Sequence, residues 1–141
     1  MTMKIKAINP SNEEIIGEVS ASSIEEVNSV VSIAKESFGS WKKTKIEEKI
    51  KLLKRLSEFL EKEKTSFTEL IMKEIGKPKI EAETEILDSQ GAVDYYCEKI
   101  KEIKERNIDF DQEFFPKTKG SVKFEPHGVI GLITPWNYPL S

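Results

Sequence analysis

Three residues of this sequence stand out as candidates for chemistry: its only cysteine, Cys97, its only histidine, His127, and Asn137, which follows an apolar run. A thiol can act as a nucleophile, an imidazole as a general base and a carboxamide as a donor to developing negative charge. Cys97 lies on the apolar face of a helical pattern without an activating histidine, which indicates an inert buried thiol. His127 sits between proline and glycine at the start of a strand, where an exposed or capping role is expected. With one histidine and one cysteine, no metal site or Ser-His triad is expected.

The apolar run before Asn137 indicates where a ligand would bind. Residues 129–133 are continuously apolar and β-branched, which predicts an inner strand of a parallel sheet covered on both faces. The chain then turns through Thr134, Pro135 and Trp136, at the strand end where open α/β sheets bind their ligands. Pro135 lacks an amide donor and so ends the strand. Taken alone, without the surrounding motif, Asn137 is better interpreted as a turn residue with its side chain tied to nearby backbone.

The N-terminal part predicts a hairpin and a capped helix. Residues 3–8 and 15–19 alternate in polarity around a turn rich in asparagine, proline and serine, as paired strands do. Ser23 and Glu26 form a capping box, so a helix should begin there. Its apolar residues recur at helical spacing as far as Phe38, and the glycine that follows suits a C-terminal cap.

Three further helices follow. Residues 46–60 carry one apolar stripe and an otherwise charged, solvated surface. Ser66 and Glu69 make a second capping box, which predicts a short helix that Gly76 terminates. A longer helical pattern runs from about 80 to 103 and should pack against the earlier helices. The residues on its apolar face are Ile86, Val93, Cys97 and Ile100.

The last third of the chain changes character. Residues 107–119 contain aspartates, a proline and several aromatic residues, and they indicate a connecting segment. Residues 121–125 alternate in polarity as a half-exposed strand does. The predicted fold class is therefore α/β: a short β-hairpin, four helices, and strands that lead into an incomplete parallel sheet.

Composition excludes several functions. The 141 residues suit one domain, and the net charge of −3 is spread without a basic stripe that could neutralise nucleic-acid phosphates. The longest apolar stretch, 128–136, is far shorter than the roughly 18 residues of a membrane span, and no signal peptide precedes it. We therefore expect a cytoplasmic protein that binds neither nucleic acid nor membrane. A single cysteine agrees with a reducing compartment.

Residues 125–140, with the sequence EPHGVIGLITPWNYPL, resemble the first cofactor motif of the aldehyde dehydrogenase family. The resemblance covers essentially the whole chain. It implies that residues 1–141 form the N-terminal part of the aldehyde dehydrogenase fold, a partial cofactor-binding domain entering a Rossmann-like sheet, with the catalytic domain absent. The upstream features that match in the same order are the Asn9-Pro10 turn, Gly17, Phe38 with Trp41, and the stretch 74–78 ahead of the long helix.

The resemblance also implies a reaction and roles for individual residues. The family oxidises aldehydes with NAD or NADP: a cysteine attacks the carbonyl, a hydride passes to the cofactor, and a glutamate-activated water releases the acid. Asn137 matches the asparagine that donates to the oxyanion of the tetrahedral intermediate. Tyr138 is placed in the substrate channel, while Trp136 could also serve as an apolar anchor. The positions that match cofactor contacts are Ile133, Thr134, Pro135 and Trp136.

The nucleophile and the base of the family would lie beyond Ser141, so this chain alone is expected to be inactive. A small aldehyde is the expected substrate of the complete enzyme, which by resemblance is a homo-oligomer, with 121–125 as a candidate strand of its assembly arm. Two alternatives remain open: a truncated, non-catalytic protein that assembles with other chains, and a free-standing helical interaction module. The reading frame after codon 141 would discriminate the partial sequence of a full enzyme from these two alternatives.

Overall fold

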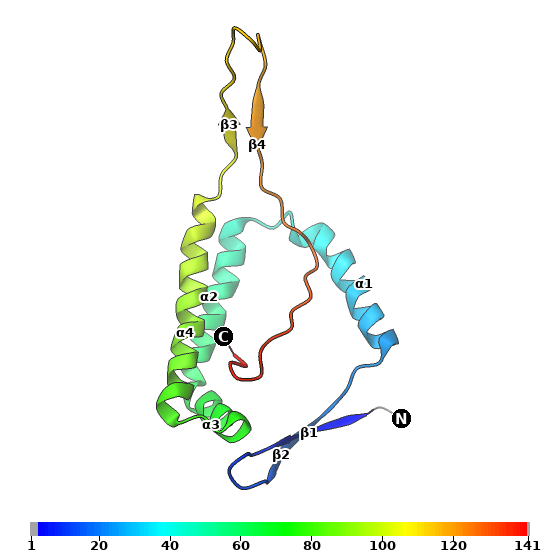
Figure 1. The fold of residues 1–141 in the computed structure, drawn as a ribbon, viewed down its shortest axis with the longest axis vertical. Helices are drawn as coiled ribbons and strands as arrows, with labels where there is room; N and C mark the ends of the chain where they lie inside the picture. Colours follow the sequence, from blue (N-terminus) through cyan, green and yellow to red (C-terminus); the bar gives the residue numbers. More distant parts are fainter. Residues whose placement is uncertain (1–2, 141) are drawn as a thin grey trace.

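The N-terminal strands form the predicted hairpin. The computed structural model describes residues 3–140, in which two antiparallel strand pairs accompany four α-helices (Figure 1). Strand β1 (Lys4–Ile8) pairs with β2 (Ile15–Ser20), and the register shifts between Ala7 and Ile8. This hairpin lies against α3 (Lys64–Ile75) at one end of the molecule.

Helix α1 (Ile24–Trp41) begins at the predicted capping box. The Ser23 hydroxyl accepts from the Glu26 amide at 3.2 Å, and the Glu26 carboxylate accepts from the Ser23 amide at 2.7 Å. No residue of α1 is buried, and Val27 and Val30 are 51% and 64% exposed. Within residues 3–140 most of the apolar stripe of this helix is therefore uncovered, and only its C-terminal part is half-buried, at Ala34 and Phe38.

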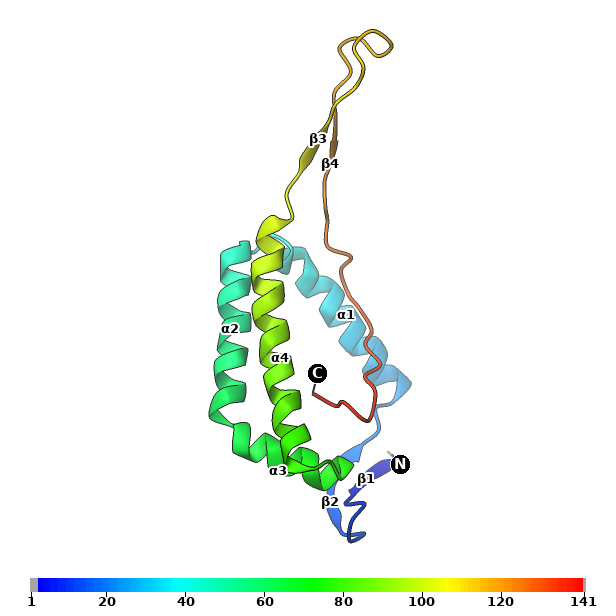
Figure 2. The same cartoon turned by 60° about the vertical axis from the view of Figure 1, so that its left-hand side comes forward.

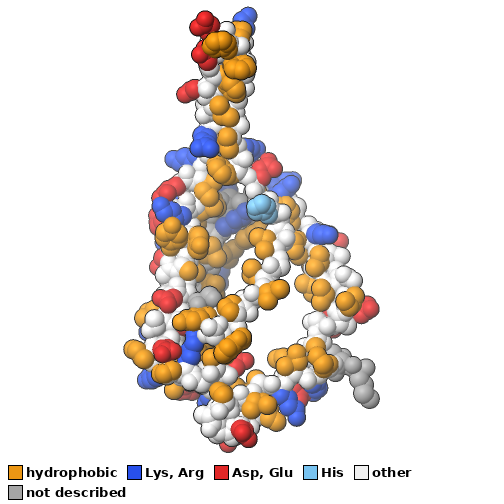
Figure 3. Space-filling model, viewed as in Figure 1, with side chains coloured by type: hydrophobic (Ala, Val, Ile, Leu, Met, Phe, Trp, Pro, Cys, Tyr) orange, Lys and Arg blue, Asp and Glu red, His pale blue; other side chains and the backbone are white. Residues whose placement is uncertain are grey.

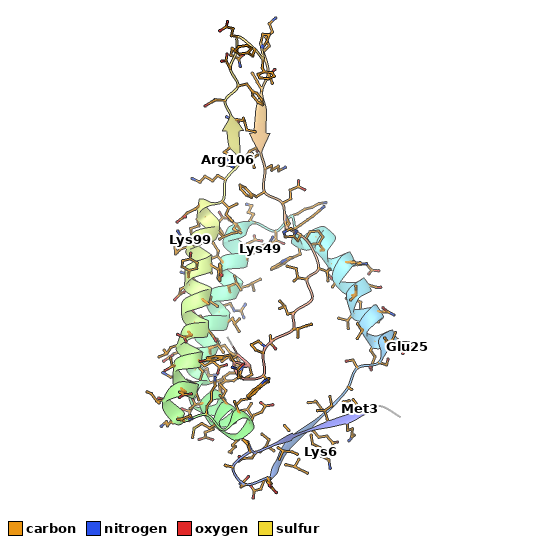
Figure 4. All side chains as sticks on the ribbon, viewed as in Figure 1. Met3, Lys6, Glu25, Lys49, Lys99 and Arg106 are labelled. Atoms are coloured by element: carbon orange, nitrogen blue, oxygen red, sulfur yellow. The ribbon has the colours of Figure 1, made fainter. Side chains whose placement is uncertain are left out.

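The predicted end of α1 at Phe38 is wrong. The Lys42 amide donates to the Phe38 carbonyl at 3.0 Å, so the helical hydrogen-bond pattern continues through Gly39. Glycine permits a left-handed cap but does not impose one. Beyond this end, the Lys49 ammonium lies 5.1 Å from the centroid of the Trp41 ring, where α1 meets α2 (Ile46–Lys62) (Figure 4).

The capping box predicted at Ser66 is also wrong, because α3 begins two residues earlier. Glu63 both ends α2 and precedes α3: its amide donates to the Phe59 carbonyl, and its carbonyl accepts from the Phe67 amide, each at 3.0 Å. One continuous backbone turn thus joins the two helices, and no side-chain cap is needed. The predicted end of α3 is confirmed, since Gly76 adopts a left-handed conformation with φ of 79°.

The core lies where α2, α3 and α4 (Lys79–Lys99) pack together (Figure 2). The predicted long helix is confirmed, with a short 3-10 turn η1 (Ile100–Glu102) at its end. On its expected apolar face Ile86 and Cys97 are buried, while Val93 and Ile100 are half-buried. The buried apolar residues that form the core cluster are Leu60, Ile71, Ala82 and Ile86.

The segment after α4 forms a projecting arm (Figure 1). Strand β3 (Arg106–Ile108) pairs antiparallel with β4 (Gly120–Val122). The predicted connection at 107–119 is therefore partly wrong, because residues 107 and 108 pair in a strand. The predicted strand 121–125 is shorter than expected, since its ladder ends at residue 122.

The predicted parallel strand at 129–133 is not formed, and residues 3–140 contain no parallel sheet. The segment is extended, and it runs from the base of the arm between α1 and the α2–α4 pair (Figures 1 and 2). A strand requires hydrogen-bonded neighbours, and the described part of the chain provides none here. The apolar pattern thus indicated a buried strand, for which residues 3–140 supply no partner strands.

The chain exposes an unusually large surface. Its accessible area is 11888 Å², against about 7,400 Å² expected for a compact monomer of 16.1 kDa. Apolar side chains are spread over the arm and the C-terminal segment (Figure 3). The elements are therefore well formed locally, but they bury little against one another. None of the described helices combines the length and the apolarity that a membrane crossing would need.

Candidate functional site

Asn137 lies at the tip of a tight turn. The Tyr138 amide donates to the Pro135 carbonyl at 3.4 Å, which closes the turn around Trp136 and Asn137. Asn137 is exposed, and among residues 3–140 its side chain has no hydrogen-bond partner. A backbone hydrogen bond therefore closes the turn, and the carboxamide is left available as a donor.

The residues expected at the cofactor line one exposed edge. Ile133 is fully exposed and Trp136 is 78% exposed, with Thr134 and Pro135 also exposed between them. Within the described residues the backbone groups of 129–134 have no hydrogen-bond partners. Free carbonyls and apolar side chains fit the ribose and ring surfaces of a nucleotide. The edge fits one wall of a nucleotide site.

The segment is anchored at its beginning by Gly128, which has φ of 102°. A Cβ added at Gly128 would lie 3.5 Å from the Phe38 ring of α1, so the backbone rests directly on that ring. A side chain at this position would be strained, because L-residues rarely adopt such a φ. Phe38, which the sequence indicated as the end of a helix and as one of the upstream family matches, thus supports the start of the segment.

At its other end the segment is held by two residues that the sequence did not reveal as functional. The fully buried Glu85 carboxylate of α4 accepts from the Leu140 amide at 2.8 Å and from the Lys77 ammonium at 2.5 Å. That ammonium lies 3.7 Å from the centroid of the Tyr138 ring. One feature of the sequence could have pointed to Glu85. It lies on the same face of α4 as the buried residues Ala82 and Ile86, where a charged side chain is unexpected.

Cys97 and His127 lie apart from this arrangement. Cys97 is 1% exposed within α4, so the expected burial of the thiol is confirmed. His127 is exposed, as expected for its place between a proline and a glycine. In the described part of the chain, no group of three or more histidine, cysteine, aspartate or glutamate residues is arranged to hold a metal.

A cavity of about 660 Å³ lies at the base of the arm, away from Asn137. Tyr95 and Tyr96 of α4 line it together with Phe124 and Arg106. Nearby, a hydrogen bond from the Lys101 ammonium at 2.7 Å lowers the pKa of the exposed Glu98 carboxyl. This cavity contains none of the residues expected to carry chemistry.

Comparison with known proteins identifies the class. The sequence matches the aldehyde dehydrogenase family over residues 1–141. It is 32% identical over 139 residues to a 1-pyrroline-5-carboxylate dehydrogenase of Bacillus cytotoxicus, covering 98% of this chain and 26% of that protein. The chain belongs to the aldehyde dehydrogenase family, and it corresponds to the N-terminal 140 or so residues of its members.

Solved structures show the same arrangement of elements. The NADP-dependent glyceraldehyde-3-phosphate dehydrogenase of Bacillus halodurans, complexed with NADP, superposes with a TM-score of 0.89 at 30% identity, covering 98% of this chain and 29% of that one. Betaine aldehyde dehydrogenase of Staphylococcus aureus, in complex with NAD+, also gives 0.89, at 27% identity over 97% of this chain and 27% of that one. The exposed elements are therefore arranged as they are in these larger folded chains.

The chain spans about a quarter of the length of the curated relatives that it matches. The hairpin, the four helices and the small antiparallel pair are the N-terminal part of the family fold. The uncovered apolar stripe of α1 and the exposed segment 129–133 lie in this part.

Proposed function

We propose that this chain is the N-terminal part of an NAD(P)-dependent aldehyde dehydrogenase that oxidises a small aldehyde to a carboxylic acid. The observation that carries the proposal is the Asn137 turn, closed by the bond from Tyr138 to Pro135 and presenting an unpartnered carboxamide. A donor held in this way costs little reorganisation when negative charge develops on a nearby oxygen. The aldehydes named for the similar structures support the substrate class.

In this proposal Asn137 stabilises the oxyanion formed when a cysteine outside this chain attacks the aldehyde carbon. The bound NAD or NADP would accept the hydride that leaves that carbon. Tyr138, half-exposed beside the turn, lines the substrate channel. Ile133, Thr134, Pro135 and Trp136 bind and orient the nucleotide through backbone carbonyls and apolar surface.

The proposal also gives residues 1–141 a place in the domain structure and in the oligomer of the enzyme. Residues 1–141 contribute part of the cofactor-binding domain, and the rest of the enzyme covers the exposed segment 129–133. The arm, including residues 121–125, takes part in homo-oligomer formation, because it projects away from the helical core and carries exposed Phe114 and Phe124. We place the enzyme in the cytoplasm, without nucleic-acid or membrane partners.

The test is Asn137→Ala in the full-length enzyme, with NAD(P)H formation and cofactor affinity measured separately. We expect kcat to fall about 10²- to 10³-fold while the cofactor Kd is unchanged, because the donor acts only on the transition state. Asn107→Ala, the same chemical change on β3, serves as the matched control and should leave kcat unaltered. A wild-type kcat for Asn137→Ala would refute the assignment.

A further inference from the structure

An ion pair between a fully buried carboxylate and a largely buried ammonium lies beside the Asn137 turn and has no part in the chemistry assigned so far. The Glu85 carboxylate is 0% exposed and the Lys77 side chain is 10% exposed, with 2.5 Å between their charged atoms. Glu85 is flanked along α4 by the core residues Ala82 and Ile86. Burying two charges is costly, and apolar residues of similar volume often stabilise a core as well or better. The pair is therefore poorly explained by stability alone.

Each charge of the pair makes a second, directional contact, and both of these contacts are with the C-terminal segment. The other Glu85 oxygen accepts from the Leu140 amide at 2.8 Å. The Lys77 ammonium lies 3.7 Å from the centroid of the Tyr138 ring. The pair thus holds the first and the third residue after Asn137.

The contacts that Glu85 and Lys77 make with the segment all lie on the C-terminal side of the Asn137 turn. Upstream, the segment is next supported at Gly128 on Phe38, and Ile133 and Trp136 between that support and the turn are exposed. Leu140 also packs against the core of α2, α3 and α4, which adds an apolar contact at the same end. The direction of the Asn137 backbone is therefore fixed mainly from residues 138 and 140.

We propose that Glu85 and Lys77 are positioning residues, which orient the Asn137 donor by holding Tyr138 and Leu140. Charge-assisted hydrogen bonds are shorter and more directional than apolar contacts, so they fix the turn to a degree that packing alone does not. Neither residue touches the reacting atoms; both act through Asn137. The inference rests on the function proposed above for Asn137.

The test is a double-mutant cycle in the full-length enzyme. Glu85→Ala, Asn137→Ala and the double variant are compared for kcat, KM and cofactor Kd. We expect Glu85→Ala to lower kcat at least about tenfold with cofactor Kd unchanged, since a displacement of about 1 Å can cost on the order of 10²-fold. In the Asn137→Ala background the same change should cost almost nothing, because the group that it orients is gone.

Two further variants separate positioning from folding. Glu85→Gln keeps the shape and an acceptor for the Leu140 amide, so it should recover part of the lost kcat; if Glu85→Ala does not fold, the cycle is run with this isosteric variant. Glu83→Ala is the matched control, because Glu83 is a half-exposed carboxylate two residues away on α4 that faces Lys79. It should leave kcat unchanged.

The outcomes are distinct. A Glu85 variant with wild-type kcat, or a loss of equal size with and without Asn137, overturns the positioning role. A wild-type kcat for Asn137→Ala overturns the proposed function itself, and the positioning role with it. Loss of kcat that depends on Asn137, with partial recovery in Glu85→Gln, supports the inference.

Discussion

Gly76 and Pro10 lie so close together that a Cβ added to Gly76 would stand 2.9 Å from the Pro10 Cγ. Gly76 caps α3 in a left-handed conformation, and Pro10 belongs to the turn between β1 and β2. The next residue after Gly76 is Lys77, which reaches the buried Glu85. The N-terminal hairpin thus packs directly against the link between α3 and α4, which contains Lys77.

Gly76→Ala should destabilise the protein by about 1 kcal/mol or more, because alanine is strained at positive φ and its methyl group meets Pro10. The measurement is the shift of Tm by scanning calorimetry. Gly91→Ala is the matched control: Gly91 lies inside α4 with no atom within 4 Å of an added Cβ. That change should instead stabilise by about 0.5–1 kcal/mol. Equal Tm values for the two variants would contradict the account.

Ser23→Ala should weaken the first turns of α1 by about 1 kcal/mol, the usual effect of losing a side-chain cap. The effect should be clear because α1 has no buried residue and depends on local interactions. Hydrogen exchange of the amides of residues 24–30 measures it. Ser29→Ala makes the same chemical change inside the helix and should not increase exchange, since alanine favours helices. Unchanged exchange in Ser23→Ala would show that the cap contributes little.

Cys97→Ala should leave aldehyde oxidation by the full-length enzyme intact, because the Cys97 side chain is buried at 1% exposure and does not belong to the site around Asn137. The stability cost should be about 1 kcal/mol, as for a small core truncation. Steady-state kinetics with thermal unfolding tests both parts. A folded variant that no longer forms the acyl-enzyme would instead show that Cys97 is not merely structural.

Residues 1–141 expressed alone should give no NAD(P)H with any aldehyde and should associate rather than remain a compact monomer. Ile133 is fully exposed and Trp136 is 78% exposed, and unpaired apolar backbone recruits other chains. Size-exclusion chromatography with circular dichroism measures the association. Ile133→Lys places a charge on this edge and should shift the protein toward monomer with its helicity retained. A sharp monomer peak with cooperative melting for the unmodified chain would refute the predicted association. Aldehyde-dependent NADH formation would refute the predicted inactivity.

Local features of this chain could be predicted from the sequence because their causes are local. The alternation around the Asn9-Pro10 turn indicated β1 and β2, and the Ser23 capping box located the start of α1. Each depends on residues a few positions apart. The boundary at Gly39 was wrong because glycine allows a helix to end without requiring it to do so.

Features that depend on distant partners could not be predicted. The apolar run 129–133 indicated a buried strand, yet a strand is defined by its neighbours, and residues 3–140 supply none there. The role of the Glu85–Lys77 pair could not be predicted from the sequence for a similar reason. Nothing near Glu85 in the sequence indicates that the Leu140 amide will meet its carboxylate.

The order in which these contacts can form follows from their separation along the chain. Leu140 meets Glu85 across 55 residues, whereas the core of α2, α3 and α4 is closed by segments that follow one another directly. Contacts between nearby segments form faster than those that close long loops. During synthesis these helices also emerge before residues 128–140. The segment that carries Asn137 therefore docks late, onto helices that have already folded. A displacement of these helices would consequently change the orientation of the Asn137 carboxamide.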